Sequence, residues 1–421
     1  MHDWTISATG LEPVPARWLA SQTYPSLGRN EPRPATYLIS GSAQAQIAAC
    51  AQVALSTGHR LVLLPGGSAQ LRCLVPAGTL LRVEPHSTST GQIPGSPVRS
   101  GWHVAMYSSG STGGSPRAYG FTTAQLDIVT AWYEAIYQGT RDTIIVTALP
   151  TAYNFAFVAG VLLAARLGAR LHLSSGHQHV LADAAILARS ADRVILLANP
   201  VILDQAVLSG RMPANVLVDS GGAPLSTAAI SDYRAQGIDL REGYGLTETA
   251  SLTHFDVEAD AASLGTVGHA LLGTHASITR RNSKPLIQLT SPAIGIPLDP
   301  VQPLPGPIIR TTDLGQIDRQ GRLRLLGRDD DEQINGLWPR DTLDALGPIL
   351  GRRCALIRHN AGQVKIRLLT NPSQEIRAAL RRHAADLLEL PLRQVDVNHH
   401  GSKPLLHSAK LTRHTARQGG S

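Results

Sequence analysis

Short apolar runs alternate with longer amphipathic segments from about residue 37 to residue 346. AQAQIAACAQVAL (43–55) has helical spacing, and RLVLLPGG (60–67) is typical of a strand that ends in a turn. Further buried strands are predicted at DTIIVTAL (142–149), DRVILLANP (192–200) and ANVLVDSGG (214–222). Strands and helices that alternate in this way indicate layered α/β structure.

Two more helices are predicted in the middle of the chain. Thr123 is positioned to cap a helix that runs to about Tyr137. The segment FVAGVLLAARLGARLHL (157–173) predicts a helix that ends near Gly168, followed by a strand.

The composition changes near residue 330, where the chain has its strongest acidic run. Downstream, the pattern predicts two strands and one helix, at CALIRH (354–359), QVKIRLLT (363–370) and SQEIRAALRRHAADLL (373–388). About ninety residues with these elements can form a small α+β domain. We therefore predict a hinge near Asp330 between a large domain (1–328) and a small one (329–421).

Composition sets the size of the core and argues against a nucleic-acid partner. With 421 residues, of which 43% are apolar, the chain can form one large or two medium-sized cores. Basic residues outnumber acidic ones by 38 to 31, but only 4% of residues are aromatic, so no nucleic-acid partner is expected. Only four of the 38 basic residues are lysines: Lys284, Lys365, Lys403 and Lys410.

Location and metal chemistry are also bounded by the sequence. No apolar run is long enough to span a bilayer and no signal-peptide pattern is present, which predicts a cytoplasmic protein without a membrane partner. The three cysteines form no C-x-x-C pair, so neither a disulfide framework nor a zinc site is expected.

MYSSGSTGGSPRAYGFT (106–122) is the chain's densest run of small, hydroxylated and glycine residues. Successive backbone N–H groups, glycines that permit positive φ and inward hydroxyls form a concave anion site. The segment lacks the lysine of G-x-x-x-x-G-K-[ST], which argues against a P-loop NTPase. A flexible linker is the alternative. The strand-like WHVAMY before the segment and the predicted helix after it favour a phosphate loop.

Five segments, in order, resemble the signatures of the adenylate-forming superfamily, which includes acyl-CoA and aryl-CoA synthetases and carrier-protein-loading adenylation enzymes. They are YSSGSTGGSPR (107–117), DSGGAPLS (219–226), GYGLTETAS (243–251), TTDLGQIDRQGRLRLLGR (311–328) and LLHSAKLTR (405–413). Arg117 stands where the family usually has lysine, one residue is inserted before Pro116, and Ala409 replaces a glycine. The resemblance implies an α/β fold with a large N-terminal domain of layered subdomains, shortened at its N-terminus, and a small C-terminal α+β domain.

The resemblance implies that most of these positions bind ATP or AMP. Tyr244 would lie against the purine, Asp313 would bind both ribose hydroxyls, and Arg328 would assist it. The other implied nucleotide contacts are Ser109, Gly110, Ser111, Thr112, Gly113, Gly221, Gly222, Ala223 and Gly245.

The resemblance also implies which groups act in catalysis. A carboxylate attacks the α-phosphate and expels pyrophosphate, so the reaction needs positioning and cations. Thr247 would contact the α-phosphate, Glu248 would hold Mg²⁺, and Arg117 would lie near the leaving pyrophosphate. Lys410 would bridge the attacking carboxylate and the α-phosphate.

The acid substrate would enter near LPTAYNFAF (149–157), which resembles the LPxxHNY segment of aryl-acid adenylating enzymes with Tyr153 in place of histidine. Asn154 would hydrogen-bond a ring hydroxyl or, alternatively, cap the following helix. Gly245 is the third expected pocket residue. An aryl acid is the first expectation, and a fatty or other acyl acid the second.

In the family, the small domain rotates about an acidic hinge residue before a thiol attacks, which implies Asp330 or Asp331 here. The thiol would belong to CoA or to the phosphopantetheine of an acyl or aryl carrier protein. An amine acceptor and a degenerate member that binds nucleotide without turnover are the alternatives. A shortened N-terminal part would leave a surface that a second subunit of a homodimer could cover.

Overall fold

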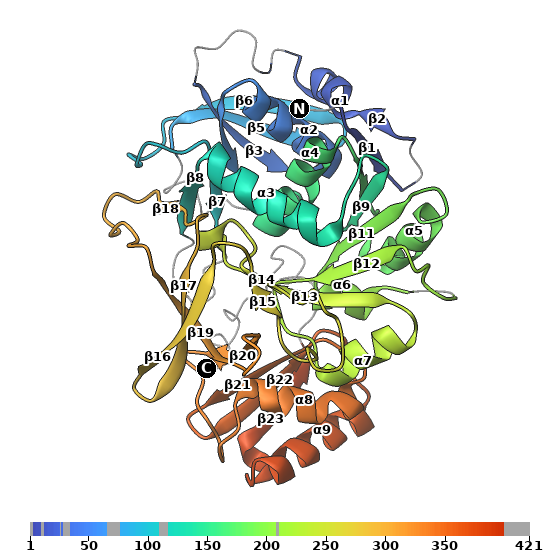
Figure 1. Ribbon diagram of the computed structural model, residues 1–421, viewed down its shortest axis with the longest axis vertical. Helices are drawn as coiled ribbons and strands as arrows, with labels where there is room; N and C mark the ends of the chain where they lie inside the picture. The colour runs from blue at the N-terminus through green and yellow to red at the C-terminus, as the bar shows by residue number, and fades with distance from the viewer. Residues whose placement is uncertain are drawn as a thin grey trace.

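The computed structural model describes residues 3–9, 12–25, 27, 34–64, 76–108, 117–207 and 210–399. Within these ranges the chain forms sheets of nine, seven, four and three strands, with helices between and beside them (Figure 1). This is the mixed α/β architecture that the alternating pattern predicts.

The nine-stranded sheet carries the longest parallel region. In order across the sheet, its strands are β15 (His269–Ala270), β14 (His254–Phe255), β13 (Asp239–Tyr244), β12 (Val216–Ser220), β11 (Arg193–Ala198), β9 (Thr143–Thr147), β10 (Arg170–Leu173), β1 (Thr5–Ala8) and β2 (Val14–Pro15). The strands from β13 to β1 are parallel. Buried parallel strands have continuous apolar sequences, which explains why β9, β11 and β12 were predicted correctly.

The seven-stranded sheet contains a strand that the pattern missed. Its order is β18 (Ile296–Pro297), β8 (Ala118–Phe121), β7 (Val104–Tyr107), β4 (Arg60–Leu63), β3 (Thr36–Gly41), β5 (Gly78–Glu84) and β6 (Ser87–Ile93). Strand β8 has only four residues, AYGF, and pairs antiparallel with β7. The predicted phosphate loop therefore joins two strands of one sheet rather than a strand and a helix.

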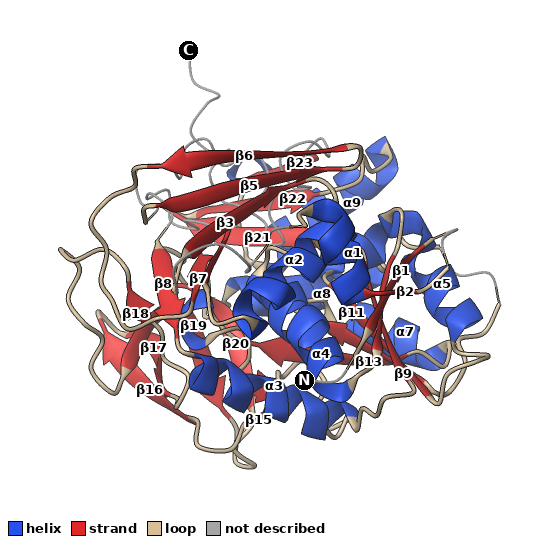
Figure 2. Ribbon diagram, turned by 90° about the horizontal axis from the view of Figure 1, so that it is seen from above, coloured by secondary structure: helices blue, strands red, loops and turns tan. Residues whose placement is uncertain are grey.

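A helical layer lies between these two sheets. It contains α2 (Gln44–Ser56), α3 (Thr123–Tyr137), the π-helix η2 (Ala156–Leu162) and α4 (Leu163–Leu167). Side chains from both sheets and from these helices form one apolar cluster. Figure 2 shows α2 and α4 between the strands β3, β5 and β6 and the strands β1 and β9.

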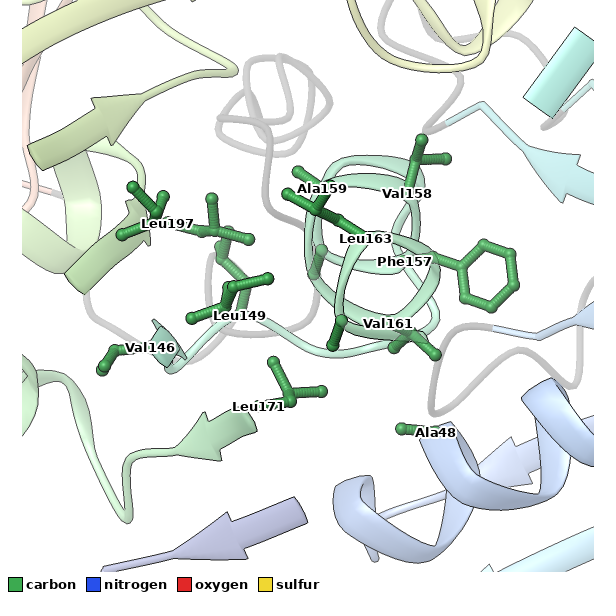
Figure 3. Packing of buried hydrophobic residues seen from close by; sticks show 14 of the residues in the cluster. Ala48, Val146, Leu149, Phe157, Val158, Ala159, Val161, Leu163, Leu171 and Leu197 are labelled. Atoms are coloured by element: carbon green, nitrogen blue, oxygen red, sulfur yellow. The ribbon is translucent and has the colours of Figure 1, made fainter. Parts of the chain in front are cut away.

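The long helix predicted before Gly168 is confirmed, but its first turns are π-helical. Gly168 ends it in the left-handed conformation, with φ 69°. Figure 3 shows Val158 and Leu163 of this helix in one apolar cluster with Ala48 of α2 and Leu171 of β10.

Among the described residues of the large part, the remaining helices are α1 (Ala16–Thr23), α5 (Val180–Leu187), α6 (Pro200–Gln205) and α7 (Thr227–Ala235), besides short 3₁₀ turns. None of the helices in the described ranges is both long and apolar enough to cross a membrane.

The C-terminal third contains two smaller sheets. An antiparallel sheet has the order β16 (His275–Arg281), β17 (Lys284–Thr290), β19 (Ile309–Ile317) and β20 (Leu323–Arg328). After it, β21 (Ala355–Asn360), β22 (Gln363–Leu368) and β23 (Val395–His399) pack with α8 (Pro339–Leu350) and α9 (Gln374–Leu387) around a separate apolar cluster. The pattern missed α8, which contains Pro348, and the short β23.

Helix α3 begins as expected, but its cap was assigned one residue too late. Thr122 has an extended backbone (φ −79°, ψ 159°), and its hydroxyl accepts a hydrogen bond from the Gln125 N–H at 3.2 Å. The Gln125 side chain accepts in return from the Thr122 N–H at 2.9 Å, which completes a capping box. Thr123 is therefore the first helical residue and not the cap. The prediction was one residue off because the helix pattern alone cannot show which of two adjacent threonines keeps an extended backbone.

We expect Thr122→Ala to lower the free energy of unfolding by about 1 kcal/mol, because the cap and one half of the capping box are lost. The exposed neighbour Thr123→Ala is the matched control and should have a much smaller effect. Urea denaturation of the two variants measures this difference, and equal losses would show that the cap is misassigned.

Candidate functional site

Two of the predicted nucleotide-binding segments lie at the carboxyl ends of β12 and β13. Gly221 and Gly222 follow β12 directly, and Tyr244 is the last residue of β13. Parallel strands end at a common edge, and ligands of open α/β sheets bind in the crevice beyond that edge. The sheet order therefore brings together two segments that the sequence keeps apart.

A cavity of about 190 Å³ lies between this edge and the C-terminal part of the chain. Its walls include six of the predicted nucleotide contacts: Gly222, Ala223, Tyr244, Gly245, Asp313 and Arg328. The opposite wall comes from the segment that follows Asp331, including α8 and β21.

A three-residue network holds Asp313 in the cavity wall. The Tyr244 hydroxyl donates to one Asp313 oxygen at 2.8 Å, and Arg328 Nη1 donates to the other at 2.6 Å. Burial, and then the Asp313 charge, hold the pKa of Tyr244 well above its ordinary value, so its hydroxyl stays a donor. A carboxylate has about four acceptor positions, so Asp313 can still accept from two ribose hydroxyls.

Arg117 and Glu248 meet at Tyr119, a residue to which the sequence gave no role. Burial, followed by the Glu248 charge, raises the pKa of Tyr119 to about 12, and Arg117 opposes this shift. Ser108 and Arg117 also close the base of the predicted phosphate loop: the Ser108 N–H donates to the Arg117 carbonyl at 2.8 Å, and the Arg117 N–H donates to Ser108 Oγ at 3.1 Å.

The residues present fit a magnesium ion that is shared with phosphates. In the parts of the chain that the structure describes, no cluster of three His, Cys, Asp or Glu residues could hold a metal by itself. Mg²⁺ commonly binds through one or two carboxylates together with substrate phosphates and water. Glu248, half-buried beside Tyr119, provides one such carboxylate.

Phe155, which follows the predicted acid-pocket residues Tyr153 and Asn154 in the chain, lies beside the glycine turn. Asn154 Oδ1 accepts a hydrogen bond from the N–H of the next residue, Phe155, at 2.9 Å. A helix N-cap bonds the N–H two or three residues further on, and η2 has no side-chain cap, so this contact is not the helix cap kept as the alternative. A Cβ on Gly221 would lie 3.4 Å from the Phe155 ring. Gly245 has no room for a side chain, because a Cβ there would lie 1.5 Å from the Ser251 carbonyl oxygen.

Asp219 is a buried carboxylate that the motif reading left without a role. It is the fourth residue of β12, and it accepts a hydrogen bond from the Tyr137 hydroxyl. Its other oxygen has no hydrogen-bond partner within the described ranges, and a Cβ on Gly243 would lie 3.3 Å from it. Nearby, the Tyr133 and Ser251 hydroxyls lie 2.8 Å apart. An acidic residue in the apolar run VLVDS was the available sequence signal.

The small C-terminal part contacts the cavity through Arg340 of α8. Its Nε donates to Asp344 at 3.0 Å, and Asp344 accepts from the Thr227 N–H at 2.9 Å. Arg340 Nη2 lies 4.0 Å from Glu242 of β13, whose pKa is raised to about 7, mainly by burial. These contacts tie α8 to both α7 and β13.

The two hinge candidates differ in exposure. Asp331 is fully buried, whereas Asp330 is exposed, and both carboxylates contact Arg358 of β21. Six predicted site residues lie outside the described residues: Ser109, Gly110, Ser111, Thr112, Gly113 and Lys410.

A glycine turn, a terminal strand tyrosine and an aspartate–arginine pair surround one cavity at the carboxyl edge of the sheet, which is where open α/β proteins bind their ligands. The sequence model of the family described as AMP-binding enzyme matches residues 49–288, which is more than half of the chain. The chain therefore belongs to the AMP-binding enzyme family.

Solved structures show the same fold. The chain is 16% identical to ATP-bound MatB from Rhodopseudomonas palustris, with a TM-score of 0.74 over 94% of this chain and 92% of that one. It is 16% identical to O-succinylbenzoate coenzyme A synthetase (MenE) from Bacillus subtilis in complex with AMP, with a TM-score of 0.73 over 99% and 96%. It is 15% identical to a benzoate CoA ligase from Burkholderia xenovorans LB400, with a TM-score of 0.71 over 97% and 95%. No curated protein sequence matches the chain.

Asp219 makes stability depend on pH in a predictable direction. Burial raises its pKa from 3.8 to about 7, so the folded protein binds this proton more tightly than the unfolded chain. The stabilisation is complete below pH 3.8 and is lost as pH rises from there to about 7. We expect Asp219→Asn to make the free energy of unfolding decline less over this interval, as measured by urea denaturation at several pH values.

The exposed Asp127→Asn is the matched control and should leave the pH profile of the native protein unchanged. An identical profile for Asp219→Asn would mean that Asp219 does not take up a proton on folding.

Proposed function

We propose that this enzyme activates a carboxylic acid with ATP as an acyl adenylate and then transfers the acyl group to a thiol. The observation that carries the proposal is the cavity in which Tyr244, Asp313 and Arg328 meet the glycine turn. Family membership supports it, as do the CoA synthetases and ligases with the same fold.

In this proposal the nucleotide lies with its purine between Tyr244 and the backbone of Gly222 and Ala223. The missing side chain at Gly222 permits close approach of a flat base. Asp313 accepts from the ribose hydroxyls while Arg328 holds the carboxylate in orientation.

The first chemical step joins a carboxylate oxygen of the acid to the α-phosphorus. The bond between the α-phosphorus and the oxygen that bridges to the β-phosphate breaks, and pyrophosphate leaves. Arg117 and Lys410 supply positive charge around the phosphates, and Thr247 contacts the α-phosphate. Magnesium held by Glu248, when bound, neutralises phosphate charge. In the second step a thiolate attacks the acyl carbon and AMP leaves.

An aryl acid is the favoured substrate. Four aromatic rings pack in sequence near the glycine turn: Phe155, Tyr133, Tyr137 and Phe255, with centroid separations of 5.4 to 6.4 Å. Three of these rings are fully buried in the core, and Phe155, which is only partly buried, is the ring that would face an aromatic substrate. Because Asn154 Oδ1 is engaged, its amide NH₂ is the group that would donate to a ring substituent, beside Tyr153. A fatty or other acyl acid is the second candidate.

The acceptor thiol belongs to CoA or to a carrier-protein phosphopantetheine in this proposal. Transfer follows reorientation of residues 329–421 relative to residues 1–328 about Asp330 or Asp331. A reducing, cytoplasmic location is supported by Cys50 and Cys354, which are both buried and free.

ATP–pyrophosphate exchange tests the proposal directly. We expect exchange with at least one of a set of benzoates, hydroxybenzoates, cinnamates and fatty acids, with the aryl acids fastest. Adding CoA or a phosphopantetheinylated carrier protein should then yield a thioester. Measurable ATP binding with no exchange for any acid would identify a nucleotide-binding protein without turnover, and an amide formed with an added amine would identify the other acceptor.

Two substitutions separate chemistry from nucleotide binding. We expect Lys410→Ala to lower the exchange rate at least about a hundredfold while ATP still binds, because positive charge at the reacting phosphate is lost. Asp313→Asn should instead raise the dissociation constant for ATP about tenfold, because the amide presents a donor to Arg328 and to the ribose. Calorimetry measures the binding.

Lys403→Ala removes a neighbouring lysine and is the control for Lys410→Ala. Equal rates for these two lysine variants would show that the C-terminal motif is misread.

A further inference from the structure

The segment 329–331 connects β20 to the small C-terminal part, and charged groups from both sides converge on it. Arg281 and Lys284 approach from the β16–β17 hairpin, and Arg358 approaches from β21. These contacts involve none of the groups assigned to nucleotide or acid, apart from the backbone of Arg328. A role for these contacts would therefore be distinct from ATP binding.

Lys284 is held in place by a tight turn. Asn282 and Ser283 have φ values of 50° and 64°, and the turn pairs Arg281 with Lys284 across the hairpin. Positive φ at both central residues is typical of two-residue hairpin turns and is uncommon for a serine. The turn therefore contains an unfavourable backbone conformation at Ser283, and it places the side chains of Arg281 and Lys284 next to the segment 329–331.

The ammonium group of Lys284 binds two backbone carbonyls of the segment. Its Nζ donates to the Asp329 carbonyl at 2.8 Å and to the Asp331 carbonyl at 2.7 Å. The backbone torsions of Asp330 lie between these two carbonyls. A rotation about them moves one carbonyl relative to the other, so at least one bond to Lys284 must break.

Asp331 closes the segment from the other side. One carboxylate oxygen accepts from the Arg328 N–H at 2.8 Å, and the other accepts from Arg358 Nε at 2.6 Å. Arg358 also donates to Asp330 at 2.6 Å. Asp331 is fully buried, and its carboxylate links the end of β20 to β21.

We propose that Lys284 is a positioning residue that latches the segment 329–331 in this conformation, with Asp331 as the second half of the latch. Reorientation of the small part requires Lys284 to release a carbonyl. The inference rests on the proposed function, in which that reorientation separates adenylate formation from thiol transfer. A compact ammonium with three donors suits a site with two carbonyls, which gives a reason for one of the chain's four lysines.

Hydrogen exchange of the full-length protein tests the latch without relying on activity. The Asp329 N–H donates to the Thr312 carbonyl and the Asp331 N–H to the Arg328 carbonyl, both at 2.8 Å, so these amides report opening of the segment. We expect Lys284→Met to speed exchange in peptides covering 329–332 about tenfold, because bonds from an ammonium are lost. Arg319→Met removes one charge from the exposed turn between β19 and β20 and should leave these peptides unchanged.

The two half-reactions provide a second measurement. We expect Lys284→Met to change the ratio of thiol-transfer rate to adenylate-formation rate about fivefold or more, whereas a general loss of folding would slow both together. Arg358→Lys cannot bond both Asp330 and Asp331 through one guanidinium, so it should change this rate ratio in the same direction as Lys284→Met. It is the substitute variant if Lys284→Met does not fold.

Unchanged hydrogen exchange in both variants would overturn the latch even if both half-reactions proceed. Absence of exchange of pyrophosphate with every acid would instead overturn the proposed function, and the hydrogen-exchange result would still decide whether the latch exists.

Discussion

The candidate site depends on the hydrogen bonds that hold Asp313 between Tyr244 and Arg328. Tyr244 ends a strand of the nine-stranded sheet, whereas Asp313 and Arg328 face each other across β19 and β20 of the antiparallel sheet. The two bonds therefore tie together two sheets whose strands do not pair. Because a bond between ionised groups is shorter and stronger than a neutral one, this contact fixes the cavity wall more firmly than apolar packing alone would.

Two buried carboxylates near the same strand ends are costly to the fold. Burial raises the pKa of both Asp219 and Glu242 to about 7, so each carries a desolvation cost when it is charged. A well-packed apolar residue would avoid that cost. Their positions, on β12 and β13 at the carboxyl edge, coincide with the place where the fold binds ligands.

Much of the fold and part of the site could be predicted from local patterns. Apolar runs identified β9, β11 and β12, since strands buried on both faces need apolar residues at every position. The motif residues Gly222, Tyr244, Asp313 and Arg328 were named from the sequence and do line one cavity. Short elements were missed. Strand β8 has only four residues, too few to show a strand pattern, and its extended conformation is fixed by hydrogen-bonded pairing with β7 and β18.

The sequence by itself determined the alternation of strands and helices, the order of the five motifs and thereby the family, because these depend on residue type and spacing along the chain. Only the tertiary structure decided that Thr122 rather than Thr123 caps α3, that Tyr137 reaches Asp219, and that Lys284 binds the carbonyls of Asp329 and Asp331. The physical reason is distance along the chain. Such contacts join residues that sheet order and turn geometry bring close together, and local hydrophobic periodicity carries no information about that proximity.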